Sequence, residues 1–260
     1  MVNLQNKIVL ITGASSGIGQ ACARLFAQNG ANLILCARRQ DRIEHLANDL
    51  QTMHGIHCLP IVLDVRDKAK VESALSSLPS EWQKISVLIN NAGLALSTDS
   101  IQQGSISNWE TMIDTNVKGL LYVTRAILPG MLAREEGHII NIGSIAGQEC
   151  YPNGNVYCAT KHAVRALTKS MRMDLLGSPI RVTEIAPGAV ETEFSEVRWN
   201  DKEKAKAFYE DFNPLYAEDI ADAVYFCATR PLHVDIAEMT IMPTAQASAS
   251  CIYRTGKKLQ

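Results

Sequence analysis

The chain has 260 residues, of which 47% are hydrophobic and 20% charged, and its formal net charge is −2. These values are typical of a core-forming protein and give no electrostatic argument for binding nucleic acid or a membrane surface. The longest uncharged run, residues 8–23, is too short to cross a bilayer, and the seven cysteines show neither paired nor metal-ligand spacing, which favours reduced thiols in the cytoplasm.

Short runs of Ile, Val and Leu alternate with longer stretches of helical periodicity along the whole chain. Uninterrupted apolar strands suit a parallel sheet that is covered on both faces. The repetition therefore predicts a single α/β domain over residues 1–260, with a doubly wound (Rossmann) sheet of about seven strands. The expected strands are residues 7–12, 32–36, 57–63, 87–90, 138–142, 181–185 and 239–242, and a further helix is expected near Tyr216. Apolar stripes at helical spacing are formed by Ile18, Cys22, Leu25 and Phe26, by Ile43, Leu46, Ala47 and Leu50, and by Met112, Ile113, Val117, Leu120 and Leu121.

The first expected strand ends in a glycine-rich turn, residues 12–19, with the sequence TGASSGIG. Glycine permits backbone angles that other residues avoid, and it lets a phosphate approach the main chain. The amides at the start of the following helix favour a pyrophosphate. The alternative is a tight strand–helix turn without a ligand. The residues expected to hold the phosphates are Gly13, Ser15, Ser16, Gly17, Ile18 and Gly19.

The end of the second strand indicates which dinucleotide would bind. A carboxylate there would bind the ribose 2′-hydroxyl of NAD. Here Cys36 and Ala37 are followed by Arg38 and Arg39, and two guanidinium groups can bind a 2′-phosphate. The pattern favours NADP, although both arginines could instead begin a solvated helix.

Two more strand ends supply candidate cofactor contacts. Asp64 and Val65 close the third strand, where an adenine ring would rest. Asn91 closes the fourth, where it could hold a loop against the cofactor. Either position could equally be a turn signal.

Tyr157 and Lys161 stand four residues apart, thirteen residues after Ser144. On a helix such a pair shares one face, and a nearby cation lowers a phenol pKa from about 10 toward the range of an acid or base. A tyrosine–lysine pair at this spacing is weak evidence alone. Combined with the glycine-rich turn, it predicts nicotinamide-dependent oxidoreduction.

These motifs, together with the NNAG sequence at residues 90–93, Asn116 and Pro187–Gly188, stand in the order found in short-chain dehydrogenases/reductases, which the chain resembles over nearly its whole length. The resemblance implies a Rossmann-type subunit that forms a dimer or, preferentially, a homotetramer. It implies that Tyr157 is the acid/base and that Ser144 binds the substrate oxygen. It further implies that Lys161 binds the nicotinamide ribose and lowers the tyrosine pKa, and that Asn116 anchors a water relay. The nicotinamide amide would be lined by Pro187, Gly188, Val190 and Thr192.

The stretch at residues 109–124 and several later segments resemble the 3-hydroxy acid dehydrogenases that act on L-serine and L-allo-threonine. This branch implies NADP-dependent transfer of hydride between the nicotinamide and a small 3-hydroxy acid, 3-hydroxyisobutyrate included, or its semialdehyde. The sequence departs from that of the branch beside the active-site serine, at residues 148–150 (Gln148, Glu149, Cys150) and 152–153. Which 3-hydroxy acid is the substrate therefore stays open. The alternatives are a reductase of another small aldehyde or ketone, such as sulfoacetaldehyde, and a non-catalytic NADP-binding sensor, which would need no acid/base pair.

A charge-rich, irregular connection at residues 188–214 is interpreted as a substrate-binding loop. Arg198 within it is the candidate for binding a substrate carboxylate, since a guanidinium can do so through two hydrogen bonds; a solvated loop arginine is the alternative. Glu193 and Cys158 are interpreted as structural. Residues 245–249 could pack against a neighbouring subunit or form a flexible tail.

Overall fold

The computed structural model describes residues 2–255 and contains, within that range, one seven-stranded parallel sheet in the order β3-β2-β1-β4-β5-β6-β7. The predicted doubly wound α/β fold is confirmed, because the strand order reverses between β1 and β4. The strands are β1 (Ile8–Thr12), β2 (Asn32–Ala37), β3 (Cys58–Val62), β4 (Ile85–Asn90), β5 (Gly137–Ile142), β6 (Ile180–Pro187) and β7 (Glu238–Ile241).

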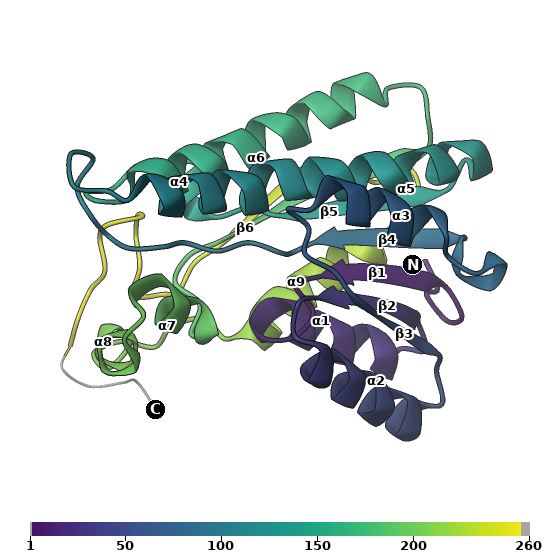
Figure 1. The fold of residues 1–260 in the computed structure, drawn as a ribbon, viewed down its shortest axis with the longest axis horizontal. Helices are drawn as coiled ribbons and strands as arrows, with labels where there is room; N and C mark the ends of the chain where they lie inside the picture. The colour runs from purple at the N-terminus through teal and green to yellow at the C-terminus, as the bar shows by residue number, and fades with distance from the viewer. Residues whose placement is uncertain (1, 256–260) are drawn as a thin grey trace.

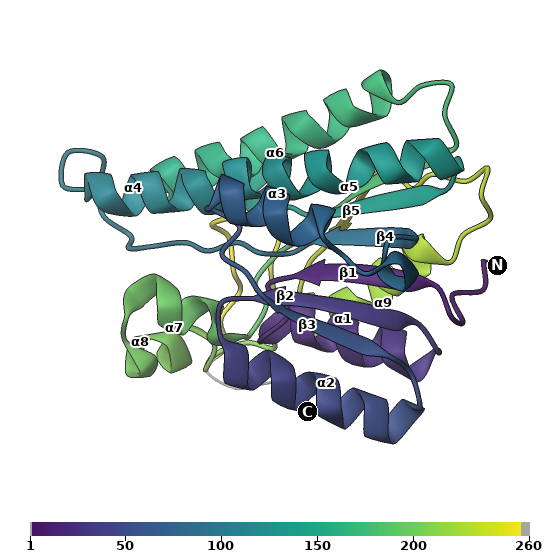
Figure 2. The ribbon, with the colours of Figure 1, turned by 45° about the vertical axis from the view of Figure 1, so that its right-hand side comes forward.

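Helices cover both faces of the sheet, as Figures 1 and 2 show. One face carries α1 (Gly17–Gln28), α2 (Gln40–His54) and α9 (Ala217–Ala228). The other carries α3 (Lys68–Ser76), α4 (Ile106–Ile113), α5 (Leu120–Arg134) and α6 (Asn155–Asp174). None of the helices between residues 2 and 255 is long and apolar enough to span a membrane.

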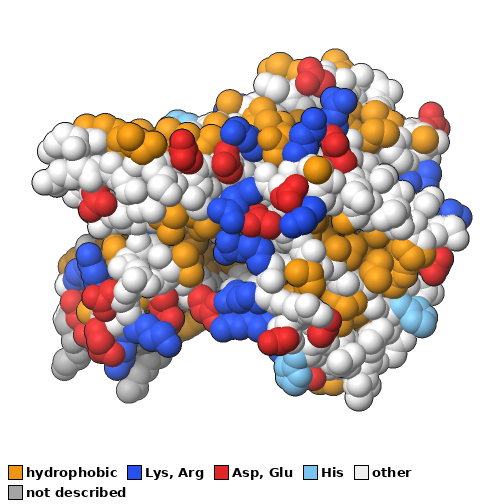
Figure 3. All heavy atoms as spheres, viewed as in Figure 1, with side chains coloured by type: hydrophobic (Ala, Val, Ile, Leu, Met, Phe, Trp, Pro, Cys, Tyr) orange, Lys and Arg blue, Asp and Glu red, His pale blue; other side chains and the backbone are white. Residues whose placement is uncertain are grey.

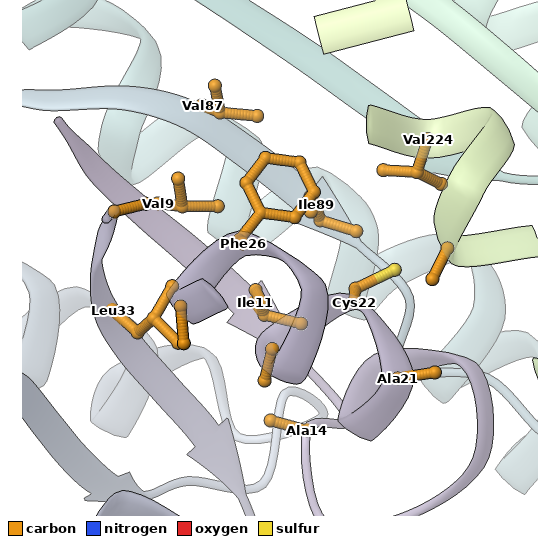
Figure 4. Close-up of a cluster of buried hydrophobic side chains, with 14 of the residues drawn as sticks. Val9, Ile11, Ala14, Ala21, Cys22, Phe26, Leu33, Val87, Ile89 and Val224 are labelled. Carbon is orange, nitrogen blue, oxygen red and sulfur yellow. The ribbon is translucent and has the colours of Figure 1, made fainter. Parts of the chain in front are cut away.

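The alternation of side chains along the strands builds a separate apolar core on each face. On the side of α1, the ring of Phe26 packs among Val9, Ile11 and Val87 of the sheet and Val224 of α9 (Figure 4). Residues on the opposite side of the same strands, such as Leu10 and Leu88, belong to the second core beneath α3 and α5. Both faces of the central strands are therefore buried, which explains their uninterrupted apolar sequence.

A π-helical turn, η2 (Asp114–Gly119), joins α4 to α5. The apolar stripe expected across this region is only partly buried: Met112 and Leu120 are buried, whereas Ile113 and Leu121 are 40% and 37% exposed. A π turn takes more residues per rotation than an α-helix does. A stripe read at constant helical spacing consequently does not stay on one face through η2.

The connection at residues 188–214 contains two short helices, α7 (Glu193–Trp199) and α8 (Lys202–Phe208), so the expectation that it is irregular is wrong. Thr192 and Asp201 cap them, each accepting a hydrogen bond from a backbone N–H in the first turn. Both helices lie beyond the carboxyl ends of the strands, on the left in Figure 1. This region therefore forms a wall over that edge of the sheet.

Candidate active site

A cavity of about 650 Å³ lies at the carboxyl ends of the strands, in the size range of small-molecule sites. It brings together nearly all the site residues predicted from the sequence. Those that line it are Gly13, Ser15, Ser16, Gly17, Ile18, Arg38, Arg39, Asp64, Val65, Asn91, Ser144, Tyr157, Lys161, Pro187, Gly188, Val190, Thr192 and Arg198. Gly19 and Asn116 lie outside the lining.

The glycine-rich turn requires its glycines for separate reasons. Gly13 and Gly17 adopt φ values of +66° and +53°, in the region that favours glycine. A Cβ on Gly19 would collide with the Gly13 carbonyl oxygen, so Gly19 serves close packing rather than the cavity wall. Asn91 donates from Nδ2 to the Thr12 carbonyl at 2.9 Å and thereby holds the turn in place. The start of α1 lies at the cavity wall, and Ser16 does not cap this helix with its side chain. The first backbone N–H groups of the helix therefore have no side-chain cap.

The two arginines expected at the 2′-phosphate lie at the same cavity. Arg38 is exposed, and Arg39 donates to the hydroxyls of Ser15 and Ser16 at 2.6–3.0 Å. Asp64 accepts from Nε and Nη2 of Arg66, and this hydrogen bonding lowers the pKa of its carboxyl. Asp64 thus remains charged near neutral pH, with Arg66 already bound to it.

Tyr157 and Lys161 lie on the same face of α6, as their spacing predicts, with the Lys161 Nζ 6.0 Å from the tyrosine ring centroid. Burial lowers the pKa of Lys161 to about 8, although the Glu184 carboxylate opposes this. Its ammonium donates to the Ile142 carbonyl at 2.9 Å.

The net shift of the Tyr157 pKa in this structure is upward. Burial raises the pKa of Tyr157 well above its ordinary value, and the groups that oppose this rise are Ser144, through a hydrogen bond, and Arg198, through its charge. Removal of the phenolate from water therefore outweighs the favourable charges around it.

Asn116 is buried and fully engaged by neighbouring groups. Its Oδ1 accepts from the Leu94 N–H at 2.9 Å, and its Nδ2 donates to the Leu94 carbonyl and to Thr160 Oγ1. The side chain therefore joins η2, α6 and the segment after β4, behind the cavity lining.

Ser144 sits between β5 and the 3-10 turn η3 (Ile145–Gly147), and its hydroxyl accepts from the Ala146 N–H at 3.1 Å. The loop after η3 divides in two. Gln148 donates to Glu238 and Thr240 of β7, and Glu149 accepts from the Ala249 N–H. Residues 148–150 therefore lie outside the cavity lining, whereas Tyr151, Pro152 and Asn153 line it. Sequence reasoning missed Tyr151.

Arg198, on α7, reaches the cavity from the side opposite α6. Its Nη2 donates to the Tyr151 hydroxyl at 2.9 Å, and its guanidinium lies 5.8 Å from the Tyr157 ring centroid. Arg198 Nε and Trp199 Nε1 are both buried without a hydrogen-bond partner among the described residues. Because buried polar groups are usually hydrogen-bonded, these two unsatisfied donors are unusual.

The C-terminal segment also borders the cavity. Gln246 is buried, accepts from the Ala189 N–H at 2.8 Å, and would block any side chain placed at Gly188. Ala249 lines the cavity as well. Residues 245–249 are thus held against the Pro187–Gly188 turn of their own chain.

Glu184 is a buried carboxylate that the sequence analysis did not single out. It lies in the middle of β6, is 1% exposed, and its Oε1 has no hydrogen-bond partner within residues 2–255. Burial, with some repulsion from Glu238, raises its pKa to about 7, while Arg165 and Lys161 oppose the rise. A carboxylate in a strand that is buried along its whole length is the only signal, and the strand also contains Arg181 and Thr183.

Because the folded pKa of Glu184 exceeds its ordinary value of 4.5, the folded state holds the proton longer than the unfolded chain. Its contribution to stability is therefore present below pH 4.5 and lost as the pH rises to about 7. We therefore compare the unfolding free energies of Glu184→Gln and the wild type by urea denaturation. The difference between them should shift by roughly 2–3 kcal/mol in favour of Glu184→Gln as the pH rises from 4.5 to 7.5. The exposed Glu110→Gln is the control; an equal gain there, or none at Glu184, contradicts the assignment.

Comparison with known proteins agrees with this geometry. The family model described as short chain dehydrogenase matches residues 7–203. An NADP-dependent 3-hydroxy acid dehydrogenase of Salmonella typhi is 50% identical over 93% of this chain and 97% of its own. Sulfoacetaldehyde reductase 2 of Chromohalobacter salexigens is 46% identical over 92% and 95%.

Among solved structures, the closed form of a serine dehydrogenase complexed with NADP+ matches with a TM-score of 0.89 and 47% identity, covering 94% of this chain and 97% of that one. The sequence motifs, the strand order and these matches agree. The chain belongs to the short-chain dehydrogenase family.

Proposed function

We propose that this protein is an NADP-dependent oxidoreductase that transfers a hydride between the nicotinamide and a small 3-hydroxy acid of the L-serine, L-allo-threonine or 3-hydroxyisobutyrate type, or the matching semialdehyde. The observation that carries the proposal is the convergence of Ser144, Tyr157, Lys161 and Arg198 on one cavity with the glycine-rich turn. The names and the 44–50% identity of the 3-hydroxy acid dehydrogenases among its relatives support it.

The cavity fits a dinucleotide phosphate at its base. The positive φ of Gly13 and Gly17 exposes backbone at the start of α1, and Ser15, Ser16 and Ile18 complete this wall. Arg38 and Arg39 would hold the 2′-phosphate. The adenine would contact Asp64 and Val65, and the nicotinamide amide would contact Pro187, Gly188, Val190 and Thr192, all of which line the cavity. When bound, the oxidised nicotinamide supplies a hydride acceptor and a positive charge.

Proton transfer falls to Tyr157. In reduction, Ser144 fixes the substrate carbonyl oxygen and the Tyr157 phenol donates its proton to that oxygen; in oxidation, Tyr157 must first lose its proton to solvent, and the phenolate then accepts the proton of the substrate hydroxyl. The raised pKa keeps the phenol protonated at neutral pH, which suits donation to a carbonyl. Lys161, fixed through the Ile142 carbonyl, supplies the ammonium that would bind the nicotinamide ribose. Asn116 supports this arrangement by holding η2 against α6.

Arg198 is the proposed ligand of the substrate carboxylate, and residues 188–214 are the proposed substrate-binding region. The place of Arg198 in the cavity lining and the hydrogen bond from its Nη2 to Tyr151 support a guanidinium fixed for an incoming anion. A sulfonate has the same charge. The reductase of Chromohalobacter salexigens therefore supports sulfoacetaldehyde as the second candidate substrate.

The test is a panel of 3-hydroxy acids, their semialdehydes and sulfoacetaldehyde, assayed by absorbance with NADP(H) and NAD(H). We expect turnover of a 3-hydroxy acid with a preference for NADP. A preference for sulfoacetaldehyde would support the second candidate. NADPH binding without turnover of any compound would contradict both and support a non-catalytic sensor.

We further propose a cytoplasmic homotetramer. Seven free cysteines support a reducing compartment. Exposed apolar side chains on α4, α5 and α6, among them Ile113, Leu121, Leu132 and Met173, support burial against another subunit. Light scattering coupled to size exclusion tests the oligomer; a monomer at micromolar concentration contradicts it.

A further inference from the structure

Glu193 joins the wall of the active site to the arginines at the opposite end of the cavity. It is the first residue of α7, and its two carboxylate oxygens accept from different arginines, from Arg39 Nη1 at 2.7 Å and from Arg42 Nη1 at 2.6 Å. Arg39 precedes α2 and Arg42 lies in its first turn. Acidic and basic side chains meet on this face between α7 and the helices α1 and α2 (Figure 3).

The hydrogen-bonding capacity of Arg39 is nearly exhausted by these contacts. A guanidinium has five N–H groups. Arg39 uses Nε and Nη2 on Ser15, Nη2 again on Ser16, and Nη1 on Glu193, which leaves one N–H. A phosphate that binds Arg39 through two hydrogen bonds must therefore displace an existing partner.

Among the partners of Arg39, the Glu193 carboxylate is the one that a phosphate would repel. Although partial burial raises it, the hydrogen bonds from Arg39 and Arg42 hold the pKa of Glu193 at about 2, so this group is charged at neutral pH. The hydroxyls of Ser15 and Ser16 are neutral and can rotate to donate to a phosphate instead. Two anions on one guanidinium repel each other.

We propose that Glu193 occupies on Arg39 the position of the cofactor's 2′-phosphate, so that NADP(H) must displace it and in doing so loosens α7 from α2. The inference rests on the proposed NADP function of Arg38 and Arg39. It makes Glu193 a specificity-determining residue that lowers the affinity for 2′-phosphorylated ligands. NAD(H), which has no phosphate there, leaves the ion pairs intact.

Binding of 2′,5′-ADP and of 5′-ADP, measured by calorimetry, isolates the contribution of the 2′-phosphate. Half-exposed ion pairs of this kind are weak, so we expect Glu193→Gln to bind 2′,5′-ADP about two- to tenfold more tightly and 5′-ADP unchanged. The matched control is Glu196→Gln, which removes the same charge from α7; no ion pair joins Glu196 to a described residue. Its affinities should equal those of the wild type. Unchanged or weaker binding of 2′,5′-ADP by Glu193→Gln overturns the inference.

A second pair of variants separates this inference from the proposed cofactor site. Arg39→Ala should reduce the preference for 2′,5′-ADP over 5′-ADP, and adding Glu193→Gln to it should have no further effect. If Arg39→Ala keeps the preference, Arg39 does not bind the 2′-phosphate, and the inference is wrong while Arg38 can still carry the proposed site. If Arg39→Ala loses it but Glu193→Gln does not gain affinity, only the competition by Glu193 is wrong. Circular dichroism of each variant checks that the fold is retained.

Discussion

Tyr157→Phe is expected to lower kcat by about 10²–10⁴, the usual contribution of a positioned proton donor or acceptor. Phenylalanine keeps the ring in the cavity wall, where it packs 5.7 Å from the ring of Phe194, and removes only the hydroxyl. The affinity for NADPH, followed by its fluorescence, should stay within about twofold of the wild type, because the phosphate and 2′-phosphate contacts lie elsewhere in the cavity.

The control for this loss is Tyr253→Phe, which removes a hydroxyl from a ring that is 72% exposed and outside the cavity lining. Its kcat should equal that of the wild type. A Tyr157→Phe enzyme with more than a tenth of the wild-type kcat would mean that another group carries the proton. The acid/base assignment would then be wrong, even if the nicotinamide site were right.

The second large effect is expected at Arg198. Hydrogen bonds to a charged group contribute about 1.5–3 kcal/mol, so Arg198→Ala should raise KM for a 3-hydroxy acid roughly 10- to 100-fold. The affinity for NADPH should not change, since α7 contributes Arg198 on the side of the cavity that faces Tyr151 and Tyr157. Steady-state kinetics together with a cofactor titration separate the two affinities.

A second arginine of the same cavity wall provides the control. Arg254 stacks on the rings of Phe208 and Phe212 and donates to the Phe208 carbonyl. Arg254→Ala removes an equal charge and should leave KM nearly unchanged. For the methyl ester of the substrate, which lacks the anionic carboxylate, Arg198→Ala should also raise KM only slightly. If acid and ester are affected equally, Arg198 acts through packing rather than through charge.

The sheet could be predicted from the sequence because its strands are buried on both faces. Ile8–Ile11 is entirely apolar and Ile139–Ile142 contains one polar residue, Asn141, so neither run shows the alternation of a half-exposed strand. The glycine-rich turn and the Tyr157–Lys161 pair were predictable for a similar reason, since the spacing of each is local. The ends of the strands were less certain: β6 continues to Pro187, which pairs with Ile241. Pairing with a strand some 50 residues later leaves no trace in the local pattern.

The remaining features depend on contacts between distant segments. The ion pairs of Glu193 with Arg39 and Arg42 span about 150 residues, and nothing beside Glu193 in the sequence indicates them. Residues 193–208 lack a long apolar stripe, because α7 and α8 are short and pack their aromatic residues on each other, as Trp199 and Phe208 do. The raised pKa of Tyr157 follows from tertiary burial, which the spacing to Lys161 does not report.

In the loop after Ser144, the residues that hold the loop in place differ from the residues that line the cavity. Gln148 and Glu149 brace the loop from outside, through β7 and the C-terminal segment, while Tyr151, Pro152 and Asn153 face the cavity. Mutation of the three inward residues can reshape the space around a reacting molecule without loosening the support of the serine. Selectivity and chemistry are thereby placed on separable parts of one short segment, so new preferences can evolve there while the reaction itself is preserved.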